Sequence, residues 1–283
     1  MEGKMYVPIL IIRLVQVAML ILILILIVIL LDTIFKKYKK KTIIIGNSQK
    51  KGKRPVQEDS FSTFETDNGL IAIVADGMGG LEHGKIASQT TVKLFTEEYT
   101  KEYELYDAQR FLINSAYKAN DRILDMASGR KIGTTLIATI IKENFFHWVS
   151  VGDSRIYLHR KGKLMKLNKE HTYKEKLHKL YEKGKISRKD VHSHPQKEFL
   201  TSYIGYEDFH ELDYSKTPIC LNRGDKIILM SDGIYKSIEE EEIKQVLNKK
   251  CCPDTKCQLI TDIIESKNLS HQDNMTVIIV ERK

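Results

Sequence analysis

Apolar residues form one long run near the start of the chain and several short runs farther on. From Leu14 to Leu31, eighteen consecutive residues include one polar side chain, that of Gln16. A helix of this length spans about 27 Å, at about 1.5 Å per residue, which is close to the hydrocarbon thickness of a bilayer. We therefore expect residues 1–35 to be an N-terminal transmembrane anchor. A cleaved signal peptide is the alternative, but the run is long for one and no small-residue cleavage site follows it.

The segment after this run carries most of the positive charge of the chain. The formal net charge is +8, and residues 33–57 hold eight lysines and one arginine but no acid. The remaining residues are together near neutral, whereas a nucleic-acid-binding domain carries its positive charge on the fold, so we exclude nucleic acid as a partner. Positive flanks stay in the cytoplasm, so we expect a single-pass protein of the cell membrane with its large domain in the cytosol. Residues 36–47 would be a basic juxtamembrane segment that either contacts anionic membrane lipid or only stops transfer.

Residues 48–283 contain no linker-like stretch, and we expect them to form one domain. Their short apolar runs predict strands, and their helical periodicity predicts helices. The runs 145–151 and 156–159 flank a Gly-Asp-Ser-Arg turn and are predicted to form a hairpin. Strands that come in hairpins and helices that come in pairs favour an α+β fold with antiparallel sheets. The predicted strands are 42–45, 70–75, 134–141, 145–151, 156–159, 225–230 and 275–280, and the helices are 85–103, 107–127, 239–250 and 254–267.

The four cysteines are not arranged as a metal site. Cys251 and Cys252 are adjacent, Cys257 follows five residues later and Cys220 stands apart. These spacings do not match a zinc-binding Cys-x2-Cys pattern, and a disulfide framework is unexpected in a chain of this length. We interpret them as free thiols in a reducing compartment, which agrees with a cytosolic domain.

Aspartates recur where the apolar runs of the domain begin or end. A single Asp-Gly after a strand is usually an ordinary turn. Several carboxylates that converge repel one another unless a cation compensates them, and hard divalent ions take such oxygen ligands. Four of these aspartates, together with Glu58 and Asp59, therefore indicate a two-metal hydrolase. Asp76 follows LIAIVA, Asp153 lies in VSVGDSR, Asp232 follows KIILMS and Asp273 precedes NMTVIIV.

Six short segments resemble motifs of the metal-dependent serine/threonine phosphatases of the protein phosphatase 2C (PPM) family, in their bacterial form. Each motif alone is weak, but six in the order of the family are specific, and they cover about residues 48–282. The resemblance implies a four-layer α/β/β/α sandwich, two antiparallel sheets flanked by helix pairs, here preceded by one transmembrane helix. The segments are RPVQEDSF at 54–61, VADGMGG at 74–80, GTT at 133–135, VGDSR at 151–155, SDG at 231–233 and DNMT at 273–276.

The resemblance also implies a metal centre with two ions, Mn²⁺ or Mg²⁺. In this interpretation Asp76 bridges the two ions and the carbonyl of Gly77 helps to hold the first. Asp232 and Asp273 hold the second ion. Two such ions lower the pKa of a bridging water, so that hydroxide attacks phosphorus and no protein nucleophile is needed.

The remaining motif residues are given supporting roles by the same resemblance. Glu58 and Asp59 would order metal-bound water behind the ions. Arg54 would bind the substrate phosphate, because its guanidinium matches phosphate oxygens bidentately. Asp153 would contribute to a third, weaker metal site. The predicted catalytic residues are Arg54, Asp76 and Asp232.

The chain departs from the family pattern near the third metal site. Lys236 lies four residues after Asp232, where an acidic or amide residue is common in the family. A cation at this place would weaken the third site. By the same resemblance, residues 170–199 are a mobile flap beside the active site, with a variable tip at 183–195.

These observations predict a membrane-anchored protein serine/threonine phosphatase. It would hydrolyse phosphoserine and phosphothreonine on protein substrates with metal-activated water, opposing a serine/threonine kinase. One alternative is a catalytically weak membrane-tethered module that binds phosphoproteins, which the Lys236 departure motivates. Another alternative is a two-metal hydrolase of small phosphate esters.

Overall fold

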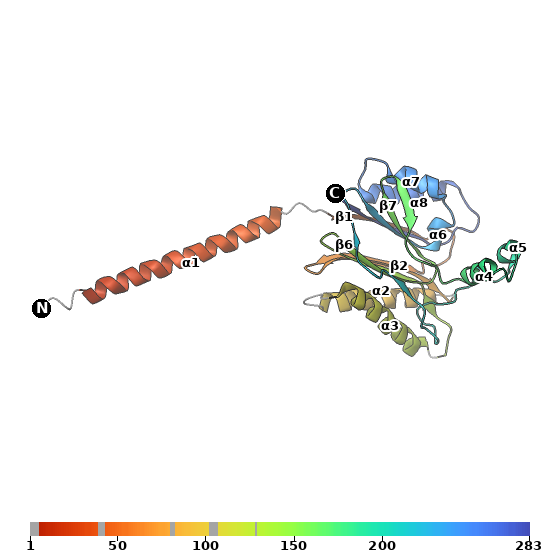
Figure 1. The fold of residues 1–283 in the computed structure, drawn as a ribbon, viewed down its shortest axis with the longest axis horizontal. Coiled ribbons are helices and arrows are strands. Elements are labelled where there is room, and N and C mark those ends of the chain that lie inside the picture. The colour runs from red at the N-terminus through yellow and green to blue at the C-terminus, as the bar shows by residue number, and fades with distance from the viewer. Residues whose placement is uncertain (1–5, 39–42, 80–82, 102–106, 128) are drawn as a thin grey trace. The chain divides into compact units, whose positions relative to one another are not determined.

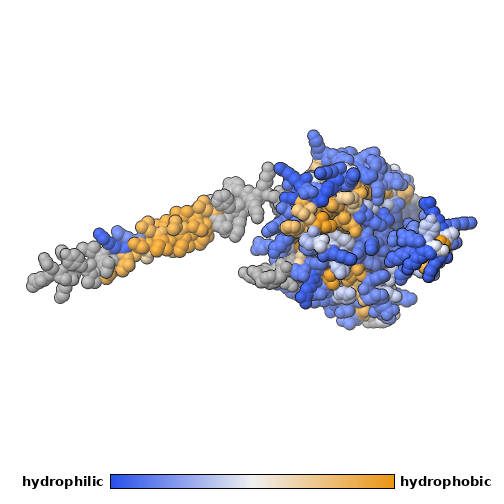
Figure 2. All heavy atoms as spheres, viewed as in Figure 1, coloured by the Kyte–Doolittle hydropathy of each residue, from blue (hydrophilic) through white to orange (hydrophobic). Residues whose placement is uncertain are grey.

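The computed structural model of the chain describes residues 6–38, 43–79, 83–101, 107–127 and 129–283. These residues belong to two units, Met1–Thr42 and Ile43–Lys283. The first unit contains helix α1, Tyr6–Tyr38. Within it, the 21 residues Ile11–Leu31 have a mean hydropathy of 3.4, and none of them is buried. Figure 2 shows a mostly apolar surface over this range, with a hydrophilic patch toward its N-terminal end, where Arg13 and Gln16 lie, and such a surface is typical of a helix that faces lipid.

The second unit is built from two antiparallel sheets, seen nearly edge-on in Figure 1. β1 begins at Ile43, within the range 36–47 that we assigned to the basic segment. In order, the five-stranded sheet is β1 (Ile43–Lys50), β12 (Met275–Arg282), β11 (Lys226–Met230), β7 (Arg155–Arg160) and β8 (Lys163–Lys166). The seven-stranded sheet is β10 (Ile219–Cys220), β6 (Phe145–Val151), β5 (Leu136–Lys142), β3 (Gly69–Met78) and β2 (Asp59–Thr66), with β4 (Gly133–Thr134) on β3 and β9 (Asp213–Tyr214) on β6.

Helices cover the outer faces of both sheets, as Figure 1 shows. This arrangement confirms the predicted four-layer α+β sandwich. α4 and α5 lie to one side of the layers, within the range 170–199 that the family resemblance predicts to be a flap. The helices on the seven-stranded sheet are α2 (His83–Lys101) and α3 (Ala108–Ala127), those on the five-stranded sheet are α6 (Asp232–Tyr235), α7 (Glu240–Leu247) and α8 (Pro253–Ser266), and those beside the layers are α4 (Tyr173–Glu182) and α5 (Arg188–Ser193).

Three apolar layers hold these elements together. On β3, Ile71 and Ile73 face α2 and α3, whereas Ala72 and Val74 face the other sheet. A third cluster lies between the five-stranded sheet and α7 and α8. Both faces of the central strands are thus buried, which explains why β3 is a continuous apolar run rather than an alternating one. The only tryptophan, Trp148, is buried in the layer between the sheets.

The predicted hairpin of residues 145–151 and 156–159 is wrong. β6 pairs with β5, β9 and β10, whereas β7 pairs with β8 and β11, so the two strands lie in different sheets. Gly152, with a φ of +94°, begins a short crossover in a backbone conformation that favours glycine. The sequence pattern shows only that one strand follows the other closely along the chain. The crossover between the two strands places Asp153 between the sheets.

Candidate active site

Two aspartates face each other across the pairing of β2 and β3. Asp59 begins β2, Asp76 lies near the end of β3, and they are direct partners in the antiparallel register. Direct partners project from the same face, with their Cβ atoms about 4.5–5.5 Å apart. Like charges so placed destabilise a sheet, so the requirements of folding do not explain the pair.

Asp59 is oriented by hydroxyl groups of the other sheet and its adjoining loop. Its Oδ2 accepts hydrogen bonds from the Ser231 hydroxyl (2.8 Å) and the Thr276 hydroxyl (2.7 Å). Its Oδ1 is buried without a hydrogen-bond partner. Burial raises the pKa of Asp59 to about 7, and the charges of Asp232 and Asp273 add to the rise while the two hydroxyls oppose it. The carboxylate is therefore fixed in direction but lacks a compensating positive charge.

Asp76 is fixed through its backbone. Its N–H donates to the Thr135 hydroxyl (3.0 Å), and its carbonyl accepts from the Thr135 N–H (2.8 Å) and the Thr134 hydroxyl (2.9 Å). The side chain retains some exposed surface. Burial, followed by the negative charges of Asp59 and Asp232, raises the pKa of Asp76 well above its usual range. A bound cation would reverse this effect.

Glu58 lies against the start of α2. Its carbonyl accepts from the Gly77 N–H (3.2 Å) and the Ser88 hydroxyl (2.5 Å), and its N–H donates to Asn274 Oδ1 (2.7 Å). Glu58 Oε1 is buried and has no hydrogen-bond partner. A Cβ on Gly84 would lie 2.5 Å from this oxygen, and one on Gly77 would lie 2.1 Å from the Gly84 carbonyl oxygen. Glycine at both positions is therefore needed for this close approach.

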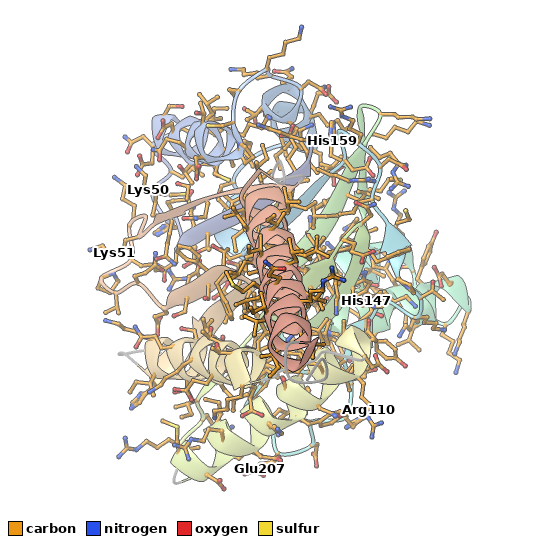
Figure 3. The ribbon with its side chains drawn as sticks, turned by 90° about the vertical axis from the view of Figure 1, so that its left-hand side faces the viewer. Lys50, Lys51, Arg110, His147, His159 and Glu207 are labelled. Carbon is orange, nitrogen blue, oxygen red and sulfur yellow. The ribbon has the colours of Figure 1, made fainter. Side chains whose placement is uncertain are left out.

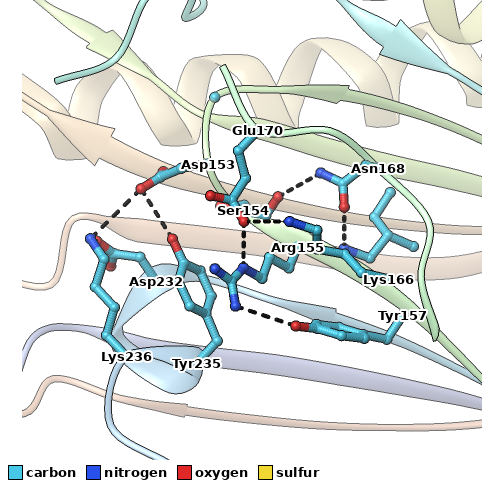
Figure 4. A network of polar contacts seen from close by, with 12 residues as sticks. Asp153, Ser154, Arg155, Tyr157, Lys166, Asn168, Glu170, Asp232, Tyr235 and Lys236 are labelled. Carbon is cyan, nitrogen blue, oxygen red and sulfur yellow. Dashed lines mark hydrogen bonds and ion pairs between the residues drawn. The ribbon is translucent and has the colours of Figure 1, made fainter. Parts of the chain in front are cut away.

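Asp153 and Asp232 share one lysine. Asp232 begins α6 and Lys236 follows one turn later, so that Lys236 Nζ lies 2.6 Å from Asp232 Oδ2 and 3.7 Å from Asp153 Oδ2 (Figure 4). The Tyr235 hydroxyl donates to Asp153 Oδ2 (3.1 Å). Asp232 Oδ1 is buried without a hydrogen-bond partner. Burial and the charge of Asp232 raise the pKa of Asp153 to about 6, although Lys236 and Tyr235 oppose the rise.

Asp273 pairs with Arg54 at the solvent edge of the site. Arg54 Nη2 lies 2.6 Å from Asp273 Oδ2, and the Arg54 side chain is 55% exposed. The neighbouring Asn274 donates from Nδ2 to the carbonyls of Lys51 (2.8 Å) and Val56 (3.1 Å). These bonds fasten the segment that carries Arg54 to the start of β12. The guanidinium is therefore held beside the acids while it stays accessible to a ligand.

The structure thus brings all of the predicted site residues to one place, where the ends of the two sheets meet. Three buried carboxylate oxygens there lack hydrogen-bond partners, and such oxygens are the ligands that Mg²⁺ and Mn²⁺ prefer, so the donor set fits a divalent ion. Over the described ranges, no three or more His, Cys, Asp or Glu side chains are already grouped as a metal site. Three of the carboxylates are instead paired with cations of the chain, Asp273 with Arg54 and both Asp153 and Asp232 with Lys236. The residues of the site are Arg54, Glu58, Asp59, Asp76, Gly77, Asp153, Asp232 and Asp273.

Three buried or half-buried histidines do not compensate the acids. His147 on β6 and His159 on β7 are labelled in Figure 3. His171 accepts a hydrogen bond at Nδ1 from the Gly152 N–H (3.1 Å). Burial lowers the pKa of all three, so their neutral forms are favoured and they add no positive charge near pH 7.

Several residues that shape the site were not singled out from the sequence. Ser231, Thr135 and Thr276 orient Asp59 and Asp76, and all three belong to motif segments, so their hydroxyls were a usable signal. Tyr235 had no such signal, because nothing in the sequence places a residue of α6 beside the crossover that carries Asp153.

Known proteins resemble this chain over most of its length. The model of the protein phosphatase 2C family matches residues 45–259. The serine/threonine phosphatase Stp of Listeria monocytogenes is 32% identical over 233 residues, which are 80% of this chain and 90% of that protein. PstP of Mycobacterium tuberculosis, a serine/threonine protein phosphatase, is 30% identical over 217 residues, 75% of this chain and 40% of that longer protein.

Solved structures resemble the described fold as well. The serine/threonine phosphatase of S. agalactiae has a TM-score of 0.76 at 28% identity and covers 85% of this chain and 100% of its own. The catalytic domain of PstP in complex with two manganese ions has a TM-score of 0.68 at 25% identity, covering 84% and 97%. The chain belongs to the protein phosphatase 2C family, as a serine/threonine phosphatase of the bacterial type.

Proposed function

We propose that the chain is a membrane-anchored, metal-dependent phosphatase that hydrolyses phosphoserine and phosphothreonine on proteins and opposes a serine/threonine kinase. The observation that carries the proposal is the set of buried carboxylate oxygens without partners beside an exposed arginine. Two Mn²⁺ or Mg²⁺ ions would be held by Asp76, the Gly77 carbonyl, Asp232 and Asp273. When bound, such ions supply a water that is acidic enough to ionise near neutral pH.

The side chains of the site would position the phosphate and the water. The Arg54 guanidinium presents parallel N–H donors that match two phosphate oxygens. Because the Arg54 side chain is exposed, it can exchange its ion pair with Asp273 for a contact with a substrate. Glu58 Oε1 and Asp59 Oδ1 remain available as acceptors for water hydrogens. Because two hydroxyls already fix Asp59, this acceptor is oriented before the substrate arrives.

Phosphate release from a phosphothreonine peptide tests the proposal. The full chain, purified in detergent, is assayed with and without Mn²⁺ beside Asp76→Asn and the exposed control Asp121→Asn on α3. Release should require Mn²⁺ and fall about a thousandfold in Asp76→Asn, because several kcal/mol of charge stabilisation is lost. Asp121→Asn should behave like the wild type. Full activity of Asp76→Asn, or activity that needs no metal, would show that the site assignment is wrong.

One observation favours a second function, phosphoprotein binding with little turnover. Arg54 and Lys236 pair with Asp273 and Asp232, so two proposed metal ligands already have cationic partners. The same assay separates the two functions. Phosphopeptide bound by the Mn²⁺-treated chain without phosphate release would support the binding module. Rapid release from p-nitrophenyl phosphate but not from the peptide would support a small-ester hydrolase.

The N-terminal helix supports a location at the membrane. Residues 11–31 are apolar except for Arg13 and Gln16, none of them is buried, and lysines follow them in the sequence. We place the domain from Ile43 onward in the cytoplasm. Protease added to inverted vesicles should degrade the domain, whereas right-side-out vesicles should protect it. Release of an intact domain that lacks residues 1–35 would instead support a cleaved leader.

A further inference from the structure

The two carboxylates on one flank of the site already share a cation. Lys236 Nζ forms ion pairs with Asp232 Oδ2 (2.6 Å) and Asp153 Oδ2 (3.7 Å), as Figure 4 shows. The Asp153 and Asp232 side chains are 10% and 17% exposed, whereas the Lys236 side chain is 44% exposed. The ammonium thus approaches from the solvent side and ends between two nearly buried acids.

The backbone fixes this approach. The Lys236 N–H donates to the Asp232 carbonyl (3.0 Å), so one turn of α6 sets the offset between the two side chains. Lysine and aspartate four residues apart on a helical turn lie on the same face. A lysine placed one residue later in the sequence would point away from Asp232. The contact is therefore built into the Asp-Gly-Ile-Tyr-Lys sequence.

A second network holds the residue beside Lys236 in place. The Tyr235 hydroxyl donates to Asp153 Oδ2, the oxygen that Lys236 faces. The Arg155 guanidinium lies 3.6 Å from the centre of the Tyr235 ring, and Arg155 Nε lies 2.6 Å from Glu170 Oε1. A stacked and paired arginine keeps Tyr235 in position. The corner formed by Asp153, Asp232 and Lys236 is thus supported from outside the site.

The carboxylates of the site differ in whether a cation of the chain pairs with them. In the parts of the chain that the structure describes, Lys236 is the cation that pairs with Asp153 and Asp232, whereas no ion pair involves Asp59 or Asp76. A divalent ion between Asp153 and Asp232 would meet an ammonium at the same oxygens and be repelled by it. An ion beside Asp76 would meet the carboxylates of Asp59 and Asp76, which form no ion pair among the described residues.

We propose that Lys236 is a resident cation of the site: its ammonium neutralises Asp153 and Asp232 together and keeps a metal ion out of the space between them. This inference rests on the proposed function, because it concerns the same carboxylates. Metal would then bind only on the Asp76 side, and Asp153 would be no metal ligand in this chain. Asp232 would use its unpartnered Oδ1 toward the Asp76 side and Oδ2 toward Lys236.

A count of bound Mn²⁺ tests this proposal without any assay of activity. The full chain in detergent is dialysed to equilibrium against Mn²⁺, and the metal is measured per chain. The wild type should bind two ions, and Asp153→Asn should bind the same number. Lys236→Asp should gain one ion per chain, and the double change Lys236→Asp with Asp153→Asn should lose it again.

Two further variants separate charge from shape and from folding. Lys236→Met keeps the length of the side chain but removes the charge, and it should also gain an ion, more weakly bound than in Lys236→Asp. Lys166→Met is the matched control, because Lys166 also pairs with a buried acid four residues away, Glu170 at 3.0 Å. This control should bind as many ions as the wild type.

The outcomes distinguish this inference from the proposed function. If Asp153→Asn binds one Mn²⁺ ion fewer per chain than the wild type, the inference is overturned, because metal then binds beside Lys236. Two ions in every Lys236 variant would overturn it as well, while the proposed function would stand. A wild type that binds no Mn²⁺ would overturn both.

Discussion

Two groups of nearly buried acids lie close together in this domain, and they have opposite electrostatic character. Glu170, with a side chain 9% exposed, is paired with Arg155 (2.6 Å) and Lys166 (3.0 Å). Burial alone would raise the pKa of Glu170, but these two cations outweigh it and lower the pKa. Asp59 and Asp76 are also withdrawn from water, and their pKa values are raised, because burial raises them, neighbouring acids add to the rise and no paired cation in the described part of the chain opposes it.

The comparison shows that burial raises the pKa of each of these acids, and that at Glu170 two paired cations reverse the rise. The network around Arg155 is closed, since Arg155 also donates to the Tyr157 hydroxyl (3.3 Å), which donates to Glu240 (3.0 Å). It stabilises the fold. The cluster around Asp76 is open, because it contains carboxylate oxygens without hydrogen-bond partners, and these oxygens fit a divalent cation.

The largest effect is expected from breaking the closed network. Glu170→Ala should lower the free energy of unfolding by about 3 kcal/mol, because it leaves the half-buried Arg155 without its carboxylate. Chemical denaturation of the metal-free protein measures this change. Lys244→Ala, which removes an exposed pair with Glu241, is the control and should change stability by less than about 0.5 kcal/mol.

The matching change in the open cluster should act in the opposite direction. Asp76→Asn removes a charge that the fold disfavours, so it should leave the metal-free protein as stable as the wild type or more stable. Equal destabilisation by Asp76→Asn and Glu170→Ala would remove the contrast between the two regions.

A smaller effect is expected at the edge of the open cluster. Arg54→Lys should lower kcat/KM about tenfold, because an ammonium keeps the charge but loses the bidentate fork. Steady-state kinetics on a phosphothreonine peptide measures it. The neighbouring exposed Lys53, changed to Arg, should leave kcat/KM unaltered. An Arg54→Lys enzyme with wild-type kinetics would mean that Arg54 does not bind phosphate.

The smallest effect is a dependence of stability on pH. The folded pKa of Asp59, about 7, lies above its ordinary value of 3.8, so between these values the folded state binds more protons than the unfolded state. Stability of the metal-free protein should therefore fall as pH rises from 5 to 8. We expect the decrease to appear as a Tm that is lower by several degrees at the higher pH.

The closed network predicts no such trend in this range. The lowered pKa of Glu170 contributes stability above about pH 4.5 that is lost only on further acidification. Thermal melts in EDTA, compared with melts in Mn²⁺, separate the two contributions. A flat profile in EDTA, or one that rises with pH, would contradict the charge assignment of the open cluster.

The sequence predicted the strands that form continuous apolar runs more readily than those that are partly polar. β3 and β11 are continuous apolar runs and were found, with their ends within a few residues. β2 was missed, because Asp59–Thr66 contains only two strongly apolar side chains, Phe61 and Phe64. Its pairing with β3 comes from the tertiary structure, and the direct register of Asp59 with Asp76 could not be predicted without it.

The site was predicted better than its surroundings for a physical reason. An acid at the end of a buried strand is visible in the sequence, and strand ends meet where two sheets meet. The contacts of Tyr235 and Arg155 are different, because they depend on how α6 packs against the crossover between the sheets. Lys236 was visible as a departure from the family pattern, but its position between two carboxylates required the structure.

Strand β1 acts as a spacer within the domain. It begins at Ile43, opposite Arg282, and ends at Lys50, opposite Met275 and close to the acids. Eight residues of strand cover roughly 25 Å, at about 3.3 Å per residue. The first residue of β1 and the acids of the candidate site are therefore at opposite ends of one strand.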